Sequence, residues 1–567
     1  MTWQGWLQIA LFAALVTLAV RPLGGYIAHI VESNGGRRRV ETAIYRMAGI
    51  DPAEEQNWAG YARALLCFHF AGILVLYGLQ RLQHGLPWNP QGLGPVAPDL
   101  AINTAVSFAT NTSWQSYAGE ATLSYFTQMA GITVQSFLSG ATGVAVSIAL
   151  TRGIARQSAR TIGNFWVDLT RITLYILLPI SILAALFLLW QGVPQTLASY
   201  IGATTMEGAH QLLARGPVAS QEAIKLLSGD GGGFFSANSA HPFENPNALT
   251  GLVEILLIFL LGAALTNTFG RIVGDERKGW ALFAVMATLF VGSVAAIYAG
   301  ETASNPALAA LASDRDPDSH GNMEGKEVRF GVAQSALFAA VSTASSDGAV
   351  NSMHDSFMPL SGGVLMANMM LDEVIVGGPG SGLFGILLFV IVATFMAGLM
   401  IGRTPEYLGK KIEANEVKMA MLALLCVPAF ILGPAALASV IQEGLDGLGN
   451  AGPHGLAEIL YAFTSAAATN GSAFAGLSAA SPFYNLTLAA AMFAGRFFVI
   501  VPVLCIAGTL AAKRRVPASA GTLPTHGVLF VSFLVGLILI VGGLVFFPAL
   551  AISPLAEHFA MLGGRAF

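Results

Sequence analysis

Long runs of apolar residues, divided by short polar segments, follow one another along the whole chain. A run of about 20 apolar residues is long enough to cross the ~30 Å hydrocarbon core of a bilayer as a helix. The pattern therefore predicts an all-α polytopic membrane protein with about ten transmembrane helices. The expected spans cover residues 3–20, 62–83, 127–149, 172–191, 250–270, 280–299, 363–402, 419–440, 483–508 and 526–547.

One of these segments, residues 363–402, is about twice as long as a single span needs to be. It contains the sequence Gly377-Gly378-Pro379-Gly380. Proline removes a helical hydrogen bond and glycine weakens a helix, so no regular helix runs through this sequence. We expect a broken helix or a loop at membrane depth.

The basic residues follow every second predicted span, as in the clusters 37–39, 152–160 and 513–515. Lysine and arginine accumulate in cytoplasmic loops, so the N-terminus and the loops opposite these clusters are expected outside. Composition agrees with a membrane protein, because 54% of the residues are hydrophobic and 11% are charged. Soluble domains carry about 25% charged residues, and a soluble enzyme is therefore excluded.

Four short loops share one design. They lie in SFATNTSW (107–114), LLSGDGGGFF (226–235), STASSDGAVN (342–351) and YAFTSAAATNGSAFAG (461–476). Each contains a triad of a small or hydroxyl residue, then Asn or Asp, then Gly or Thr. The triads begin at Thr110, Gly229, Ser346 and Thr469, at intervals of 119, 117 and 123 residues. A near-constant period indicates an internal repeat.

Each repeat has a span, a short apolar helix, a triad loop and a second span, which is an M1-P-M2 unit with a re-entrant pore loop. The four units are expected to be pseudo-fourfold, with one extra helix at each end. The repeats are expected at residues 61–165, 166–275, 276–412 and 413–515, a first helix with its cytoplasmic connection at 1–60, and a last helix with its tail at 516–567.

Irregular backbone at membrane depth is tolerated where it lines a cavity. Four such loops around one axis would gather backbone carbonyls that replace the hydration shell of a cation. One Thr-Asn-Gly by itself is most often an ordinary turn, and the period could reflect packing repeats without a pore. The apolar helix before every loop favours the pore.

The amino-acid sequences of several segments resemble those of the KdpA family, the potassium-binding subunits of the bacterial Kdp potassium-transporting ATPase. The resemblance covers essentially the whole chain. Its most specific segments are TNTSWQSYAGE (110–120), GDGGGFFSANSAHPFENP (229–246), DGAVNSMHDSFMPLSGG (347–363), GGPGSGLFG (377–385) and TNGSAFAG (469–476). The family belongs to a superfamily of K⁺ transporters built from four M1-P-M2 units. Its filter loops are looser relatives of the TVGYG loop of potassium channels, which this chain lacks.

The resemblance implies that K⁺ is the transported ion and the only metal ion expected, at a filter formed by these loops. The implied filter residues are Asn111, Thr112, Asp230, Gly231, Asp347, Gly348, Asn470 and Gly471. The expected supporting residues are Thr110, Gln115, Gly229, Gly232, Ser346 and Thr469. The chain departs from the family at Asp230 and Asp347, where uncharged residues are usual. We hypothesise that these carboxylates raise cation affinity from just outside the filter.

A second set of residues is expected to control the ion path below the filter. Arg496 falls in the middle of a predicted span, and Asp372 and Glu373 precede Gly378 in the broken segment. A charge at that depth costs at least ~2.5–3.5 kcal/mol unless it is paired. Arg496 is expected to pair with Asp372 or Glu373, either as a structural salt bridge or as a gate. The resemblance implies that the ion leaves sideways, into a P-type ATPase subunit.

The sequence has no G-x-x-x-x-G-K-[ST] motif and no D-K-T-G phosphorylation motif. We therefore expect no nucleotide binding and no catalytic site in this chain. The resemblance implies a KdpB-like P-type ATPase partner and a KdpC-like subunit, and a small KdpF-like peptide remains a possible third partner. It also implies that the complex lies among the lipids of the bacterial cytoplasmic (inner) membrane. The filter loops are then expected on the periplasmic side. No nucleic acid partner is expected.

Two alternatives remain at this point. The first is an autonomous K⁺ channel or K⁺ symporter of the same superfamily. The second is a membrane enzyme that uses His241, His354, Asp372 and Glu373 as acid–base or metal groups. The three cysteines lie far apart in apolar segments, so a disulfide framework or zinc site among them is not expected.

Overall fold

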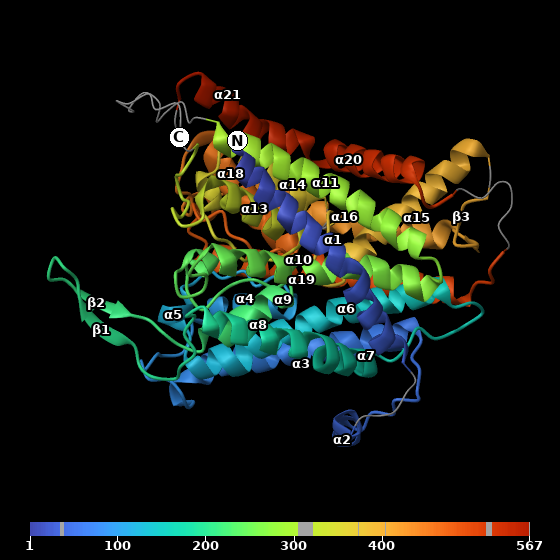
Figure 1. The fold of residues 1–567 in the computed structure, drawn as a ribbon, viewed down its shortest axis with the longest axis horizontal. Coiled ribbons are helices and arrows are strands. Elements are labelled where there is room, and N and C mark those ends of the chain that lie inside the picture. Colours follow the sequence, from blue (N-terminus) through green and yellow to red (C-terminus); the bar gives the residue numbers. More distant parts are fainter. Residues whose placement is uncertain (34–38, 304–320, 372–373, 403, 517–523, 566–567) are drawn as a thin grey trace.

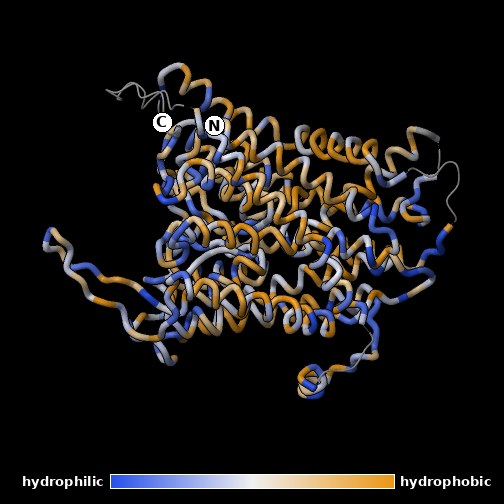
Figure 2. The backbone as a smooth tube through the Cα atoms, in the orientation of Figure 1, coloured by the Kyte–Doolittle hydropathy of each residue, from blue (hydrophilic) through white to orange (hydrophobic). Residues whose placement is uncertain are grey.

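The computed structural model describes residues 1–33, 39–303, 321–371, 374–402, 404–516 and 524–565. Among these residues, ten helical segments are long and apolar enough to span a membrane. They lie side by side in one bundle, whose middle is apolar and whose two ends carry most of the polar chain (Figure 1, Figure 2). The predicted all-α polytopic class is confirmed.

The spanning segments are built as follows. They comprise α1 (Trp3–Glu32), α3 (Trp58–Leu82), α6 (Val134–Ala155), α8 (Leu178–Trp190), α10 (Ala248–Val273), α11 (Glu276–Thr302), α15 (Ser381–Ile401), α16 (Ala414–Ala438), α19 (Pro482–Ala512) and α20 (Val528–Leu550). Four of them continue from or into shorter pieces, namely η1 (Gln83–Gly85) after α3, η2 (Thr127–Thr133) before α6, α7 (Phe165–Arg171) and η3 (Ile172–Leu177) before α8, and η6 (Ala551–Leu555) and α21 (Ala556–Leu562) after α20.

Four short, buried helices enter the bundle from the end that also carries the β1–β2 hairpin (Figure 1). They are α4 (Pro98–Ala109), α9 (Val218–Leu227), α13 (Gly331–Ala344) and α18 (Gly452–Ala467). Each is too short to cross a bilayer and packs against the spanning helix that precedes it in its repeat. The order of the helices follows the predicted repeats, which are α3–α4–α6, α8–α9–α10, α11–α13–α14–α15 and α16–α18–α19.

The long third-repeat segment is broken, as the sequence predicts. Helix α14 (Pro359–Met370) ends before the glycine-rich stretch and α15 starts at Ser381. The irregular chain between them turns back under α13, because the N–H groups of Val376 and Gly377 donate to the Ala344 carbonyl at 3.1 and 2.9 Å. The broken element therefore places non-helical backbone directly against the end of a pore helix.

The first helix is longer than expected. Residues 1–60 are expected to hold a first helix at 3–20 and then a cytoplasmic connection, whereas α1 continues to Glu32 and α2 (Arg39–Ala48) follows. Pro22 lies within α1, and Gly24 lies against α10, where an added Cβ would be 2.6 Å from the Ala264 carbonyl oxygen. Close packing on α10 thus keeps this part of the chain helical despite Pro22.

The remaining elements lie at the two ends of the bundle. At the pore-helix end are the antiparallel hairpin of β1 (Ile201–Thr204) and β2 (His210–Leu213), α5 (Gly119–Thr122), α17 (Gln442–Leu445), η4 (Asn238–Ala240) and η5 (His354–Ser356). At the opposite end, β3 (Glu406–Tyr407) pairs with β4 (Lys410–Lys411).

Candidate functional site

The four triad loops meet in the centre of the bundle and form a closed ring. Each loop contacts the next through a specific group. The Asn111 side-chain N–H donates to the Gly229 carbonyl at 2.6 Å, the Gly348 N–H to the Asp230 carbonyl at 3.1 Å, and the Ser346 hydroxyl to the Thr469 carbonyl at 2.8 Å. The fourth loop returns to the first, since an added Cβ on Gly471 would lie 1.7 Å from the Thr112 carbonyl oxygen. Four segments far apart in sequence thus surround one axis.

All four pore helices end in the same way. After the last helical turn, one N–H reaches back to the carbonyl five residues earlier, as in a Schellman cap. The four bonds run from Thr112 to Ser107 (3.0 Å), Asp230 to Lys225 (3.0 Å), Asp347 to Ser342 (3.3 Å) and Asn470 to Ser465 (2.9 Å). The residue just before each donor has a positive φ: 61° at Asn111, 56° at Gly229, 57° at Ser346 and 51° at Thr469.

These caps correct the register of the first triad. The backbone equivalent of Thr469-Asn470-Gly471 is Asn111-Thr112-Ser113, whereas the sequence comparison began the first triad at Thr110. Thr110 instead occupies the helix C-cap, where Ala468 stands in the fourth repeat. Both the first and the fourth loop contain Thr-Asn, but aligning the two loops on these residues shifts the first loop by one position. The end of the pore helix, and not the residue identity, determines which positions are equivalent.

The corrected register reveals a further repeated position, five residues before the cap donor. Serine stands there in three repeats and lysine in the second, at Ser107, Lys225, Ser342 and Ser465. The three hydroxyls support their own loops: Ser107 donates to the Trp114 carbonyl at 2.9 Å, Ser342 donates to the Asp347 carbonyl at 2.6 Å, and Ser465 accepts from the Gly471 N–H at 3.0 Å. Comparing the four motifs with this offset would have found the position from sequence.

Glycine is required where the loops approach one another. Gly231 has φ 100°, and a Cβ there would lie 2.3 Å from the Gly348 nitrogen. Gly471 has φ 92° and faces the Thr112 carbonyl oxygen. Both values fall in the left-handed region that favours glycine. Side chains at these two positions would push the ring apart.

The two acidic residues of the ring are fully buried. One Asp230 oxygen accepts a hydrogen bond from the Ser113 hydroxyl of the first loop, and one Asp347 oxygen accepts from the Ala349 N–H at 2.8 Å. The second oxygen of each carboxylate has no hydrogen-bond partner among the described residues. Both carboxylates therefore belong to the wall of the ring, and Asp230 also fastens the second loop to the first.

Gln115 braces the first loop against the second. Its side chain accepts from the Gly233 N–H at 3.0 Å and donates to the Gly233 carbonyl at 3.2 Å. Gly232 lies beside the same side chain, since a Cβ there would be 3.2 Å from the Gln115 amide carbon. The structure thus places both of these expected supporting residues at one contact between loops.

A buried ion cluster stands behind the second loop. Lys225 Nζ lies 2.7 Å from Glu222 Oε2, 2.7 Å from Glu244 Oε2 and 2.8 Å from Asn238 Oδ1. The side chains of Lys225 and its two acidic partners are at most 2% exposed. Asn238 in turn donates to the Gly232 carbonyl, and Glu244 accepts from the Phe235 N–H at 2.8 Å. Sequence reasoning missed this cluster.

The glycine-rich break lies directly beneath the ring. A Cβ at Gly229 would be 2.2 Å from Pro379 Cδ, and one at Gly378 would be 3.4 Å from Ser346 Cβ. Arg496 of α19 is 4% exposed and donates to the Ser139 carbonyl at 3.2 Å. It lines a small cavity together with Thr469 and Ser381. Asp372 and Glu373, the expected partners of Arg496, lie outside the described residues.

The two histidines of the rival enzyme hypothesis have separate surroundings. His241 stacks on Phe235 with the ring centres 3.8 Å apart, and its Nδ1 accepts from the Phe243 N–H at 3.0 Å. His354 is buried, with Nδ1 2.7 Å from the Tyr461 hydroxyl. Neither belongs to the group of possible metal ligands found among the described residues. Among the described residues the two histidines therefore do not come together in one site, and Asp372 and Glu373, the other two groups of this hypothesis, lie outside those residues.

A ring of four re-entrant loops inside a bundle of spanning helices defines a membrane transport protein of the pore-loop class. The chain belongs to the KdpA family, described as the potassium-transporting ATPase A subunit, whose sequence profile matches residues 10–559. It is 62% identical over 575 aligned residues to the potassium-transporting ATPase potassium-binding subunit of Methylorubrum populi, covering 100% of this chain and 99% of that protein.

Other relatives agree. The protein of the same description from Brucella anthropi is 58% identical over 575 residues, covering 100% of both chains. Among solved structures, the potassium transporter TrkH from Vibrio parahaemolyticus has a TM-score of 0.51 at 13% identity, covering 88% of this chain and 98% of that one. The TrkH likeness shows a shared fold, whereas the relatives show the family.

Proposed function

We propose that this chain is the potassium-binding and translocating subunit of an ATP-driven K⁺ uptake complex, and that the ring of four loops is its selectivity filter. The observation that carries the proposal is the closed ring of contacts among the four loops, each of which follows an equivalent helix cap. The identity of the ion, K⁺, is inferred from the relatives, which are named as potassium-binding subunits. In the corrected register, Thr112 and Ser113 of the first loop are equivalent to three other pairs of residues. These are Asp230 and Gly231, Asp347 and Gly348, and Asn470 and Gly471.

The physical logic is that of a substitute hydration shell. Carbonyl dipoles from four loops lower the cost of removing water from K⁺, and the buried carboxylates of Asp230 and Asp347 add negative charge beside them. One carbonyl, that of Asp230, also accepts from the Gly348 N–H and ties two loops together. This unequal ring suits tight binding of one ion better than fast conduction.

The test is the K⁺ dependence of ATP hydrolysis by the complex purified with its partner subunits. Gly231→Asp should raise the K⁺ concentration for half-maximal activity by at least about a hundredfold, roughly 2.7 kcal/mol, because the new side chain meets the Gly348 backbone. Gly94→Asp is the matched control, since an added Cβ at the exposed Gly94 meets nothing within 4 Å. Equal K⁺ dependence of Gly231→Asp and wild type would refute the filter assignment.

We also propose that the ion does not pass straight down. The Gly378–Pro379 turn covers the underside of the ring, and the positive charge of Arg496 repels a cation beneath the fourth loop. A lateral exit toward a P-type ATPase partner, KdpB-like, remains. A KdpC-like subunit and a small KdpF-like peptide complete the proposed complex in the bacterial inner membrane, with the filter loops facing the periplasm.

Arg496→Met tests this path. We expect an ATP-independent K⁺ leak through the reconstituted complex and fewer K⁺ ions moved per ATP, because the repulsive charge is gone. Arg63→Met is the control, since Arg63 lies exposed on α3. If Arg496→Met changes neither the leak, the coupling nor the apparent K⁺ affinity, Arg496 is a structural residue only.

A further inference from the structure

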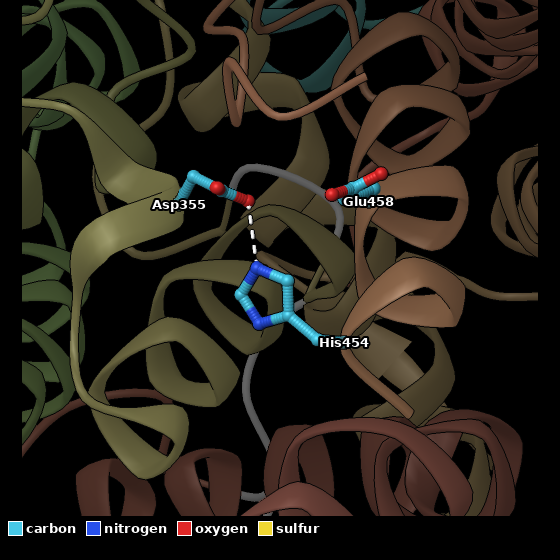
Figure 3. A group of neighbouring side chains, drawn as sticks. All are labelled: Asp355, His454 and Glu458. Carbon is cyan, nitrogen blue, oxygen red and sulfur yellow. Dashed lines mark hydrogen bonds and ion pairs between the residues drawn. The ribbon is translucent and has the colours of Figure 1, made fainter. Parts of the chain in front are cut away.

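A second cluster of polar side chains lies apart from the ring, at the bundle end where the pore helices begin (Figure 3). Asp355 comes from η5, and His454 and Glu458 come from α18. One ligand atom from each of the three residues lies within 4.8 Å of the other two. His454 and Glu458 are four residues apart and so share one face of α18. The Asp355 N–H donates to the Phe474 carbonyl at 2.9 Å, which fixes the third member.

Glu458 is the unusual member of this cluster. It is fully buried, and its Oε2 accepts from the Gly449 N–H at 2.9 Å. Its Oε1 has no hydrogen-bond partner among the described residues. Figure 3 shows an oxygen of this carboxylate directed toward Asp355 and His454. A buried carboxylate oxygen without a partner costs free energy, so the cluster is incomplete as it stands.

The charges of the cluster also favour binding of a cation. Glu557 of α21 joins the cluster, with Oε1 2.8 Å from His454 Nδ1, while Asp355 Oδ1 lies 3.0 Å from His454 Nε2. The cluster thus brings three carboxylates around one imidazole. Among the described residues, no lysine or arginine forms an ion pair with any of the three. A single imidazole can offset at most one of the three carboxylate charges.

We propose that Asp355, His454 and Glu458 bind one divalent first-row cation, with Zn²⁺ as the best fit. Imidazole nitrogen and carboxylate oxygen are both zinc ligands, and three such protein ligands leave a fourth position for water. The cation takes Nε2 of His454, and Nδ1–H remains bonded to Glu557. A carboxylate that orients a ligating histidine through its second nitrogen is a regular feature of zinc sites.

The cation competes with a proton at the same nitrogen. Burial by itself lowers the pKa of His454, but the hydrogen bonds to Asp355 and Glu557 raise it to about 10. Binding therefore releases one proton from the imidazole, as metal binding to histidine generally does.

The position of the site gives it a structural role. The cation would clamp η5, α18 and, through Glu557, α21. From His454 a stack of aromatic rings leads inward: its ring lies 5.9 Å from that of Phe474, which lies 4.6 Å from that of Tyr461. The Tyr461 hydroxyl is 2.8 Å from the hydroxyl of Ser472, the residue after Gly471. The clamp thus steadies the outer side of the fourth loop.

The experiment uses the complex with its partner subunits, stripped by a chelator and titrated with ZnCl₂. The wild type should bind about one equivalent more Zn²⁺ than Glu458→Gln or His454→Gln, and Zn²⁺ should raise the thermal unfolding temperature of the wild type alone. His210→Gln is the matched control, because His210 is exposed on β2. It should bind like the wild type.

Equal zinc stoichiometry in the wild type and both cluster variants would overturn the proposal. If the variants do not assemble, X-ray absorption of the zinc-loaded wild type decides instead. A first shell of one imidazole nitrogen and carboxylate or water oxygens supports the site. A shell containing sulfur, from cysteines elsewhere, or one without nitrogen would refute it.

Discussion

The second and fourth loops of the ring have the same backbone turn but opposite kinds of support. Behind the second loop stands a buried ion cluster centred on Lys225, at the position where the fourth repeat has Ser465. Behind the fourth loop stands a neutral chain, in which Tyr461 joins the hydroxyl of Ser472 to His354. Equivalent geometry can thus be held either by charge or by hydroxyl and aromatic groups.

The two kinds of support differ in the free energy that is lost when one of their groups is removed. A buried ion pair adds little net stability over apolar packing, yet removing one partner leaves a buried charge and costs ~3–5 kcal/mol. Loss of one neutral hydrogen bond costs ~0.5–1.5 kcal/mol. We therefore expect the second loop to be far more sensitive to a single substitution than the fourth.

The largest effect is expected for Lys225→Met. Glu222 and Glu244 would remain buried without their cation, so the complex should lose ~3–5 kcal/mol of stability. The K⁺ affinity should fall because Asn238, which donates to the Gly232 carbonyl, loses its hydrogen bond from Lys225. Thermal unfolding and K⁺-dependent ATP hydrolysis measure the two effects separately.

Lys326→Met provides a matched control for that substitution. Lys326 forms a buried pair with Glu301 at 2.7 Å, both side chains being 0% exposed, and its other side-chain contacts among the described residues, to the Glu324 carbonyl and the Phe357 ring, lie outside the four filter loops. It should destabilise the protein to a similar extent without changing the K⁺ dependence. If both variants change K⁺ affinity alike, the second loop has no special reliance on its ion cluster.

A middle-sized effect is expected for Asp230→Asn, which gives the second loop the residue that the fourth has at Asn470. Removing a carboxylate from the ring wall should raise the half-saturating K⁺ concentration by about tenfold, roughly 1.4 kcal/mol. Asp347→Asn tests the third loop in the same way. Unchanged K⁺ dependence of ATP hydrolysis in both variants would show that the carboxylates do not contribute to cation affinity.

The smallest effect is expected for Tyr461→Phe in the neutral support. The substitution removes one hydroxyl but keeps the ring stacked on Phe474, so stability should fall by about 1 kcal/mol and K⁺ affinity by less than about threefold. Thermal unfolding and a K⁺ titration check both values. If Tyr461→Phe lowers stability and K⁺ affinity as much as Lys225→Met does, the two loops do not differ in their sensitivity to substitution.

Much of the architecture was predictable because it depends on local patterns. Apolar runs marked the spans, the Gly377–Gly380 sequence marked the break between α14 and α15, and the repeated triads marked the ends of the pore helices. Asn470 and Gly471 were correctly placed in a buried loop, as were their counterparts in the second and third repeats. The exact start of the first triad was not predictable from matching letters, since Thr110 caps its helix.

The sequence by itself therefore determined the class of protein, the four repeats and the residues that turn at each pore helix, because helix length, glycine and proline act within a few residues. Only the tertiary structure decided which groups hold those turns. Lys225 meets Glu244, Ser113 meets Asp230, and His454 meets Asp355 across separations that no local pattern encodes. Such contacts follow from how the ten helices pack, and they give four similar loops their different supports.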